Sequence, residues 1–154
     1  MPNNNSNFFI GVNVFVVRDG KLLLGKRKNC YGAGTWALPG GHLEQGEKLV
    51  AGAARELMEE TGLSAESFEF TNIVNDPSTK KRHYLQIGFL AIGVKGEPDN
   101  KEPERCEEWC WFDLSALPEN IFPNHKKQIE LFVAKQGRYG EADQGPTLAY
   151  RDGP

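Results

Sequence analysis

Three glutamates stand close together in the segment RELMEE, at Glu56, Glu59 and Glu60. Residues three and four positions apart share one face of a helix, so these carboxylates would lie side by side. Like charges at this spacing repel one another, but a divalent cation between them would be attracted by all three. Mg²⁺ binds oxygen ligands and keeps waters and substrate phosphates in its shell. The triplet therefore indicates a metal site, and a solvated acidic face on a surface helix is the alternative.

The segment that must carry these carboxylates reads as a helix. Residues 48–61 are rich in Ala, Glu, Leu and Met, and Gly62 stands where a helix stop is expected. Gly52 falls on the acidic face, one turn before Glu56. A mid-helix glycine costs about 1 kcal/mol relative to Ala, and room for a bulky group beside the glutamates would compensate for it. The other side of the helix, expected to pack on a sheet, carries Val50, Ala53, Ala54, Leu57 and Thr61.

The stretch from Gly41 to Leu63 resembles the Nudix box of the Nudix (MutT-type) hydrolases, GX5EX7REUXEEXGU, in which U is apolar. All nine constrained positions are filled: Gly41, Glu47, Arg55, Glu56, Leu57, Glu59, Glu60, Gly62 and Leu63. A chance match of this kind is very improbable, which argues against the solvated face. The resemblance implies an α/β fold, the family's α/β/α sandwich, in which a mixed β-sheet lies between helices.

The resemblance also implies a metal centre that hydrolyses a nucleoside diphosphate linked to another group. Mg²⁺ would be the cofactor, with Mn²⁺ as a substitute. By motif position, Glu56, Glu59 and Glu60 would hold the metal together with the carbonyl of Gly40. Either Glu56 or Glu60 would take the proton from the attacking water, and the motif leaves this choice open.

Two further box residues, Glu47 and Arg55, would brace the junction between loop and helix and so orient Glu56. Gly41, beside Gly40, would leave space for the diphosphate.

Family members often supply one more acid from a loop that precedes a late strand. The matching region here is EPERCEEWCWF, in which Glu104, Glu107 and Glu108 qualify by type. Glu107 stands directly before the expected strand and is therefore the predicted metal ligand. A solvated acidic loop is the alternative.

The segments GKRKNCYGAGTWALPGGHLEQGE and EPERCEEWCWF resemble the branch of the family that contains nucleotide triphosphate diphosphatases. That resemblance predicts cleavage of a (deoxy)nucleoside triphosphate to the monophosphate and pyrophosphate, with oxidised nucleotides among the substrates. The alternatives are a nucleotide sugar, ADP-ribose, a dinucleoside polyphosphate or an isoprenoid diphosphate. A non-catalytic sensing domain is less favoured, because such domains usually lose box glutamates.

Contacts to the rest of the substrate carry weaker signals. Arg27 closes a predicted strand beside a glycine-rich loop and could bind phosphate oxygens, or it could be a surface cation. Phe122 matches an aromatic that stacks on the base in similar proteins, although Pro123 follows it where relatives commonly have Trp. A core residue at the start of a helix is the alternative for Phe122. Asn75 and Gln86 lie on two predicted middle strands and could contact base edges.

Along the chain, residues 1–7 are expected to be loose and residues 8–137 to form the Nudix domain. Within the domain, residues 8–27 read as a hairpin around Asp19-Gly20, and a second helix is expected from His125 to Gly137. Residues 138–154 hold few apolar groups and are expected to form a tail with little regular structure.

Composition excludes several classes of protein. A net charge of −3 offers no cationic footprint for a nucleic-acid duplex. Three scattered cysteines argue against a disulfide framework. There is no signal peptide and no apolar run of membrane length, so we expect a cytoplasmic protein that acts on a small-molecule nucleotide and does not bind membranes. The branch often forms homodimers, and the resemblance extends that expectation here.

Overall fold

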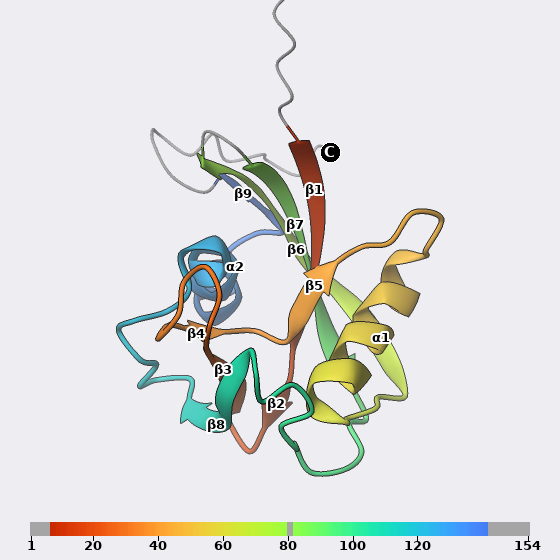
Figure 1. Ribbon diagram of the computed structural model, residues 1–154, viewed down its shortest axis with the longest axis vertical. Coiled ribbons are helices and arrows are strands. Elements are labelled where there is room, and N and C mark those ends of the chain that lie inside the picture. The colour runs from red at the N-terminus through yellow and green to blue at the C-terminus, as the bar shows by residue number, and fades with distance from the viewer. Residues whose placement is uncertain (1–6, 80–81, 142–154) are drawn as a thin grey trace, which may run out of the picture.

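The computed structural model describes residues 7–79 and 82–141. Its larger sheet has five strands (Figure 1). They run in the order β5 (Gly40–His42), β1 (Asn7–Phe15), β7 (Arg82–Ile92), β6 (Ser67–Thr79) and β9 (Tyr139–Glu141). β1 is parallel to β7 and β6 is parallel to β9, while the β1–β5 and β6–β7 pairs are antiparallel. The sheet is therefore mixed.

Helices cover both faces of this sheet, α1 (Leu49–Thr61) on one side and α2 (Pro123–Ala134) on the other (Figure 1). Alternate residues of a strand point to opposite faces. Val12 and Val14 accordingly pack in the core cluster that contains Leu57 of α1. Phe15 packs in the cluster that contains Ile129 of α2. The predicted α/β/α sandwich with a mixed sheet is confirmed.

A second sheet contains β2 (Val17–Arg18), β3 (Lys21–Arg27), β4 (Trp36–Ala37) and β8 (Cys106–Asp113). The hairpin predicted over residues 8–27 was too long. The Asp19-Gly20 turn joins only β2 to β3, which pair in antiparallel fashion from Val17 to Leu22. β1 does not belong to the hairpin because β5 and β7 flank it on its two edges.

The first helix has the predicted end. Gly62 adopts the left-handed conformation at φ 73°, and its N–H donates to the carbonyl of Met58. The predicted buried side was partly wrong: Val50 is 46% exposed and Ala54 is also exposed, since the sheet receives a narrower stripe of the helix. That stripe consists of Gly52, Ala53, Leu57 and Thr61.

The second helix begins two residues earlier than predicted, at Pro123, whose fixed φ and missing N–H suit the first position of a helix. It ends at Ala134, before the predicted Gly137, because Lys135 already adopts the left-handed conformation at φ 52°. β9 lies at the start of the predicted tail and pairs with β6, and residues 142–154 lie outside the described part. Among the described residues, no helix has the length and apolarity to cross a membrane.

Candidate active site

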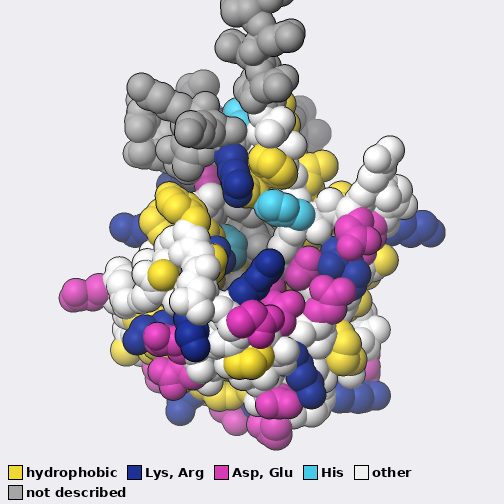
Figure 2. Space-filling view, viewed as in Figure 1, with side chains coloured by type: hydrophobic (Ala, Val, Ile, Leu, Met, Phe, Trp, Pro, Cys, Tyr) yellow, Lys and Arg dark blue, Asp and Glu magenta, His cyan; other side chains and the backbone are white. Residues whose placement is uncertain are grey.

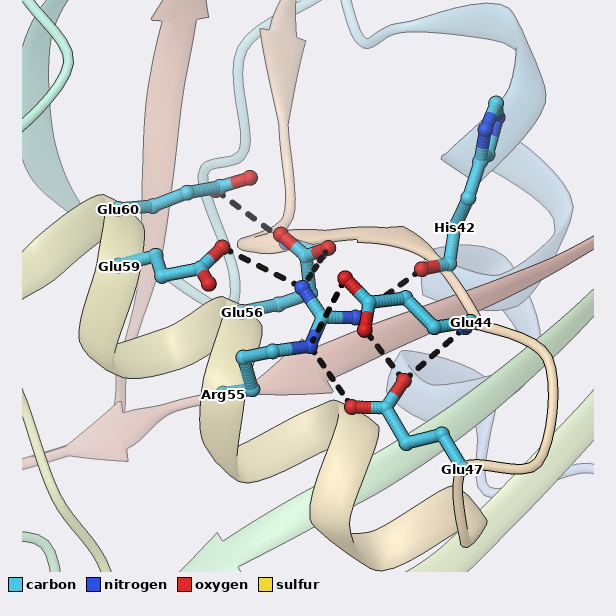
Figure 3. Close-up of polar contacts among 8 residues, drawn as sticks. His42, Glu44, Glu47, Arg55, Glu56, Glu59 and Glu60 are labelled. Atoms are coloured by element: carbon cyan, nitrogen blue, oxygen red, sulfur yellow. Dashed lines mark hydrogen bonds and ion pairs between the residues drawn. The ribbon is translucent and has the colours of Figure 1, made fainter.

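Arg55 lies at the centre of the acidic face of α1 (Figure 3). Its Nε and Nη2 donate to the two carboxylate oxygens of Glu47, at 2.7 and 3.0 Å. Its Nη1 donates to Glu56 at 2.8 Å and to Glu59 at 3.3 Å, and Nη2 also donates to the carbonyl of His42 at 3.1 Å. The predicted brace is thus present as a contact: one guanidinium joins the loop after β5 to the helix.

The loop end of this brace is strongly anionic. Hydrogen bonds from Arg55 and from the backbone N–H of Glu44 lower the pKa of Glu47 to about 2. Glu47 therefore stays ionised over the whole working range of pH, and the ion pair with Arg55 persists with it.

Glu60 turns away from Arg55 toward the strand that precedes the helix (Figure 3). It accepts the backbone N–H of Gly40 at 3.3 Å. Burial of the carboxyl group raises the pKa of Glu60 well above its usual value, and the charges of Glu56 and Glu102 raise it further. Burial also raises the pKa of Glu56, against the lowering effect of Arg55. The negative charges of Glu56 and Glu60 are therefore close to each other and are only partly neutralised by the surrounding protein.

This electrostatic arrangement fits a divalent cation. A cation between Glu56 and Glu60 would relieve both the burial cost and the mutual repulsion. Among residues 7–79 and 82–141, no three acidic, His or Cys side chains already converge on one point in ligand geometry. Glu59, predicted as a third ligand, points to Arg55 (Figure 3). Its side chain is 51% exposed and on the surface of the helix.

Two acids outside the box, Glu102 and the predicted ligand Glu107, have different surroundings. The predicted Glu107 is exposed and forms an ion pair with Lys26 at 3.1 Å, on the neighbouring strand β3. Glu102 is half-buried, and its charge acts on both Glu56 and Glu60. Sequence reasoning missed Glu102, although it begins the same acidic loop, since type and nearness to the strand do not show which carboxylate faces α1.

The glycines around the cluster differ in what they make room for. A Cβ on Gly41 would lie 2.4 Å from a carboxylate oxygen of Glu56, so only glycine lets that side chain approach β5. Gly40 is equally close to β1, where a Cβ would lie 2.4 Å from Oδ1 of Asn13. The space predicted beside Gly52 is not open to a ligand, because Leu43 and Glu47 fill it.

Arg27 and Phe122 are brought together directly. The guanidinium carbon of Arg27 lies 4.0 Å from the centroid of the Phe122 ring, and Nε donates to the carbonyl of Tyr31 at 2.9 Å. Phe122 is only 6% exposed, and a Cβ on Gly32 would come within 2.7 Å of its ring. The ring is enclosed by protein, as expected for the alternative of a core residue at the start of a helix, and stacking on a base stays a prediction.

Asn75 and Gln86 are not brought together. Gln86 pairs with Val74 across β6 and β7, so Asn75, the next residue, points to the opposite face of the sheet. Asn75 donates to Glu141 of β9 at 2.8 Å. Gln86 is buried on the α2 side and accepts a hydrogen bond from Asn13 at 2.8 Å. Only Gln86 faces the side of the sheet on which α2 lies.

The first turn of α2 adds buried polar groups that sequence reasoning missed. Oδ1 of Asn124 is buried and has no hydrogen-bond partner within the described part of the chain. Nδ1 of His125 accepts the backbone N–H of Leu38 at 3.1 Å. Burial, with a smaller effect of Arg27, lowers the pKa of His125 to about 3, so the ring is neutral. The helical spacing of Asn124 and Gln128 was the available signal for a polar stripe facing the sheet.

Figure 2 shows a hollowed face of the molecule, with acidic and basic side chains gathered together over α1. Gln128 links α2 to the sheet by accepting a hydrogen bond from Asn13 at 2.8 Å and donating one to Asn72 at 3.2 Å. Because Asn13 also pairs with Gly40 in the register of β1 and β5, this network reaches the strand beside Glu60.

The comparisons with known proteins agree with this geometry. The family model described as the NUDIX domain matches residues 7–132. The oxidized purine nucleoside triphosphate hydrolase of Mus musculus is 34% identical over 149 residues, which is 89% of each chain. The ADP-ribose pyrophosphatase of Methanocaldococcus jannaschii is 35% identical over 125 residues, covering 80% of this chain and 72% of the relative.

A solved structure of a MutT NUDIX hydrolase from Burkholderia pseudomallei superposes with a TM-score of 0.75 at 33% identity. It covers 80% of this chain and 97% of the other. The matched residues include the acidic helix and every strand of the larger sheet except β9. The chain therefore belongs to the Nudix family of MutT-type hydrolases and is a pyrophosphohydrolase.

Proposed function

We propose that the protein hydrolyses a (deoxy)nucleoside triphosphate to the monophosphate and pyrophosphate with Mg²⁺, and that oxidised purine nucleotides are among its substrates. The observation that carries this substrate class is the likeness to the mouse oxidized purine nucleoside triphosphate hydrolase over 89% of each chain. Box residues alone do not choose the nucleoside, because they handle only the diphosphate.

The metal would be held by Glu56, Glu60 and Glu102, with the carbonyl of Gly40 and with Glu59 once it leaves Arg55. When bound, a divalent cation neutralises diphosphate oxygens and lowers the pKa of a coordinated water. The buried, mutually repelling carboxylates of Glu56 and Glu60 support this assignment.

The chain's own residues supply the rest of the chemistry. Arg27 binds a phosphate oxygen and, with the backbone at Gly41, holds the diphosphate against α1. Water attacks phosphorus in line with the leaving oxygen, and the carboxylate of Glu56 or Glu60 accepts its proton. The Arg55–Glu47 pair holds the Glu56 carboxylate in position during the reaction, since the Arg55 guanidinium joins the helix to the loop.

The nucleoside would lie on the α2 side of the sheet. Gln86 and Asn124 present buried amide groups there, and Oδ1 of Asn124 offers an acceptor to an N–H donor of a base. A site that satisfies such a buried group rejects ligands that leave it unpaired.

A second candidate is ADP-ribose. It is favoured by the 35% identity to the Methanocaldococcus jannaschii ADP-ribose pyrophosphatase. The chain is also 30% identical to an RNA pyrophosphohydrolase of Bartonella clarridgeiae, covering 84% of this chain and 88% of the relative, so a 5′-triphosphate RNA belongs in the same test.

The test is product analysis on a substrate panel in the presence of Mg²⁺. The panel contains standard and oxidised (d)NTPs, ADP-ribose, a nucleotide sugar, a dinucleoside polyphosphate, a 5′-triphosphate RNA and an isoprenoid diphosphate. Pyrophosphate with a nucleoside monophosphate, abolished by EDTA and by Glu60→Gln, supports the proposal. Turnover of ADP-ribose alone would replace the substrate class, and no turnover of any compound would reject hydrolysis of this panel.

A further inference from the structure

We propose that Phe122 is a positioning residue for Arg27, and that it acts on the diphosphate end of the site rather than on the base. The proposal rests on the proposed function for the role of Arg27 as a phosphate ligand. It is an alternative to the stacking role that the family resemblance implies for Phe122.

The first support is the contact itself. A guanidinium within about 6 Å of a ring centroid is attracted by the negative face of the aromatic ring, and here the distance is 4.0 Å. Arg27 is half-buried at the end of β3, where its long side chain would otherwise have several rotamers. The Phe122 ring favours the rotamer in which the guanidinium lies over the ring. Arg27 is thereby ordered before any ligand arrives.

The second support is how the ring itself is held. Phe122 precedes the first residue of α2, and its N–H donates to the carbonyl of Trp36 at 2.8 Å. The rings of Tyr31 and His125 meet it edge-on, with centroids 6.0 and 5.0 Å away. Gly32 closes against the ring because it has no side chain. Phe122 is therefore a fixed platform, and Arg27 already occupies a face that a base would need.

The third support is what remains uncommitted on Arg27. Its Nε–H is used by the carbonyl of Tyr31. Among residues 7–79 and 82–141, its two terminal amino groups make no hydrogen bond or ion pair. These donors match the paired oxygens of a phosphate group. The Arg27 guanidinium is held by the ring contact and by its Nε hydrogen bond, and both terminal amino groups remain available. It is therefore positioned to bind an anionic ligand.

The fourth support is the location of this charge. The backbone of Arg27 pairs with Cys106 at the start of β8, directly after the acidic loop. Its guanidinium contacts Phe122, the residue that precedes α2. An anion bound by its free donors would therefore lie where β3, β8 and α2 meet.

The test is a double-mutant cycle. Phe122→Leu, Phe122→Tyr and Arg27→Ala are made singly, and Phe122→Leu is combined with Arg27→Ala. The steady-state substrate is the panel compound with the highest turnover. We expect Phe122→Leu to lower kcat/KM about tenfold, Phe122→Tyr to retain it within about twofold, and Phe122→Leu to cost less than about twofold when Arg27 is already Ala. If Phe122→Leu lowers kcat/KM by the same factor in the wild type and in Arg27→Ala, the proposal is overturned.

A second measurement separates phosphate from base. Inorganic tripolyphosphate has no base, and its binding is measured by calorimetry with Mg²⁺ present, without turnover. Phe122→Leu should weaken this binding about as much as it weakens kcat/KM, and unchanged binding would overturn the proposal in favour of base stacking. No binding of tripolyphosphate to the wild type would overturn it as well.

The matched control is Phe132→Leu on the same helix. Phe132 stacks on Phe15 at 4.3 Å and does not contact Arg27, so it tests the loss of a ring from α2 alone. Equal losses of tripolyphosphate binding in this control would also overturn the proposal. Suppose that the protein hydrolyses no nucleoside triphosphate, while Phe122→Leu still lowers kcat/KM for another diphosphate only when Arg27 is present. In that case the proposed function fails, and the positioning of Arg27 by Phe122 is supported.

Discussion

Arg55 binds both carboxylate oxygens of Glu47, through Nε at 2.7 Å and Nη2 at 3.0 Å. This fork joins a residue of the loop after β5 to a residue in the middle of α1. The same guanidinium donates to Glu56 through Nη1. One cation therefore fixes both the path of the loop and the position of a carboxylate that faces the active site.

Arg55→Lys should disable the enzyme while leaving the fold. A lysine ammonium keeps the charge but cannot match the two oxygens of Glu47 while also holding Glu56. We expect kcat to fall at least a hundredfold and the free energy of unfolding to fall by about 1–3 kcal/mol. Urea denaturation and steady-state kinetics measure the two effects. The control is Lys95→Ala, which removes an exposed ion pair with Glu66 and should change neither. Full activity in Arg55→Lys would show that the fork is not required.

Glu60→Gln should abolish hydrolysis and yet stabilise the metal-free protein at neutral and alkaline pH. Burial and the charges of Glu56 and Glu102 hold the pKa of Glu60 above its usual value, so ionised Glu60 destabilises the metal-free fold. That cost appears as pH rises through the raised pKa, and glutamine removes it. Thermal melting in EDTA should show a higher Tm for the variant above that pH, with exposed Glu130→Gln as the control. A lower Tm would contradict this electrostatic account.

The same variant provides a metal test. Wild-type protein should gain thermal stability when Mg²⁺ or Mn²⁺ replaces EDTA, because a ligand that binds only the folded state stabilises it. Glu60→Gln should lose most of that gain. A Mg²⁺-dependent shift of the same size in both proteins would remove Glu60 from the metal site.

Gly41→Ala should impair activity without preventing folding. The added Cβ would lie 2.4 Å from Oε1 of Glu56, so the carboxylate has to move. We expect kcat/KM to drop at least tenfold, since displacement of a catalytic group by a fraction of an ångström is costly. The control is Gly20→Asn, in an open turn whose left-handed backbone asparagine tolerates. An unchanged kcat/KM in Gly41→Ala would show that the Glu56 carboxylate can move without loss of activity.

Acid should destabilise the protein partly through His125. Its pKa is about 3 in the folded state against about 6.5 when unfolded, so the unfolded chain binds the extra proton between these values. Stability is therefore lost as pH falls from about 6.5 toward 3, by up to about 1.4 kcal/mol per pH unit from this group. His125→Asn keeps an acceptor for Leu38 and cannot become protonated. Urea denaturation at pH 5 and pH 7 should show a smaller pH effect in the variant, and an equal effect would refute this.

The parts predicted best from the sequence are those in which local chemistry and periodicity agree. The helix stop at Gly62 follows from the need for a left-handed residue there, and the contacts of Arg55 with Glu47 and Glu56 follow a strict motif. By contrast, the separation of β1 from β3 is set by pairing with strands far along the chain. A turn signal such as Asp19-Gly20 is local and does not show where the pairing stops.

The substrate side was less predictable for the same reason. Asn75 and Gln86 were grouped because both are polar strand residues, yet the register of β6 and β7 places them on opposite faces. Glu107 and Glu102 belong to one acidic loop, and only the folded path of that loop shows which of them acts on Glu60. Residue type identified the candidates, and tertiary register selected among them.

Hydrolysis of an oxidised nucleotide is measured most directly by phosphorus NMR of the oxidised purine triphosphate 8-oxo-dGTP incubated with the protein and Mg²⁺. We expect the triphosphate resonances to be replaced by those of pyrophosphate and a nucleoside monophosphate, in equal amounts, and neither product to form with EDTA or with Glu60→Gln. Release of inorganic phosphate with a diphosphate, or equal product formation by Glu60→Gln, would contradict this expectation.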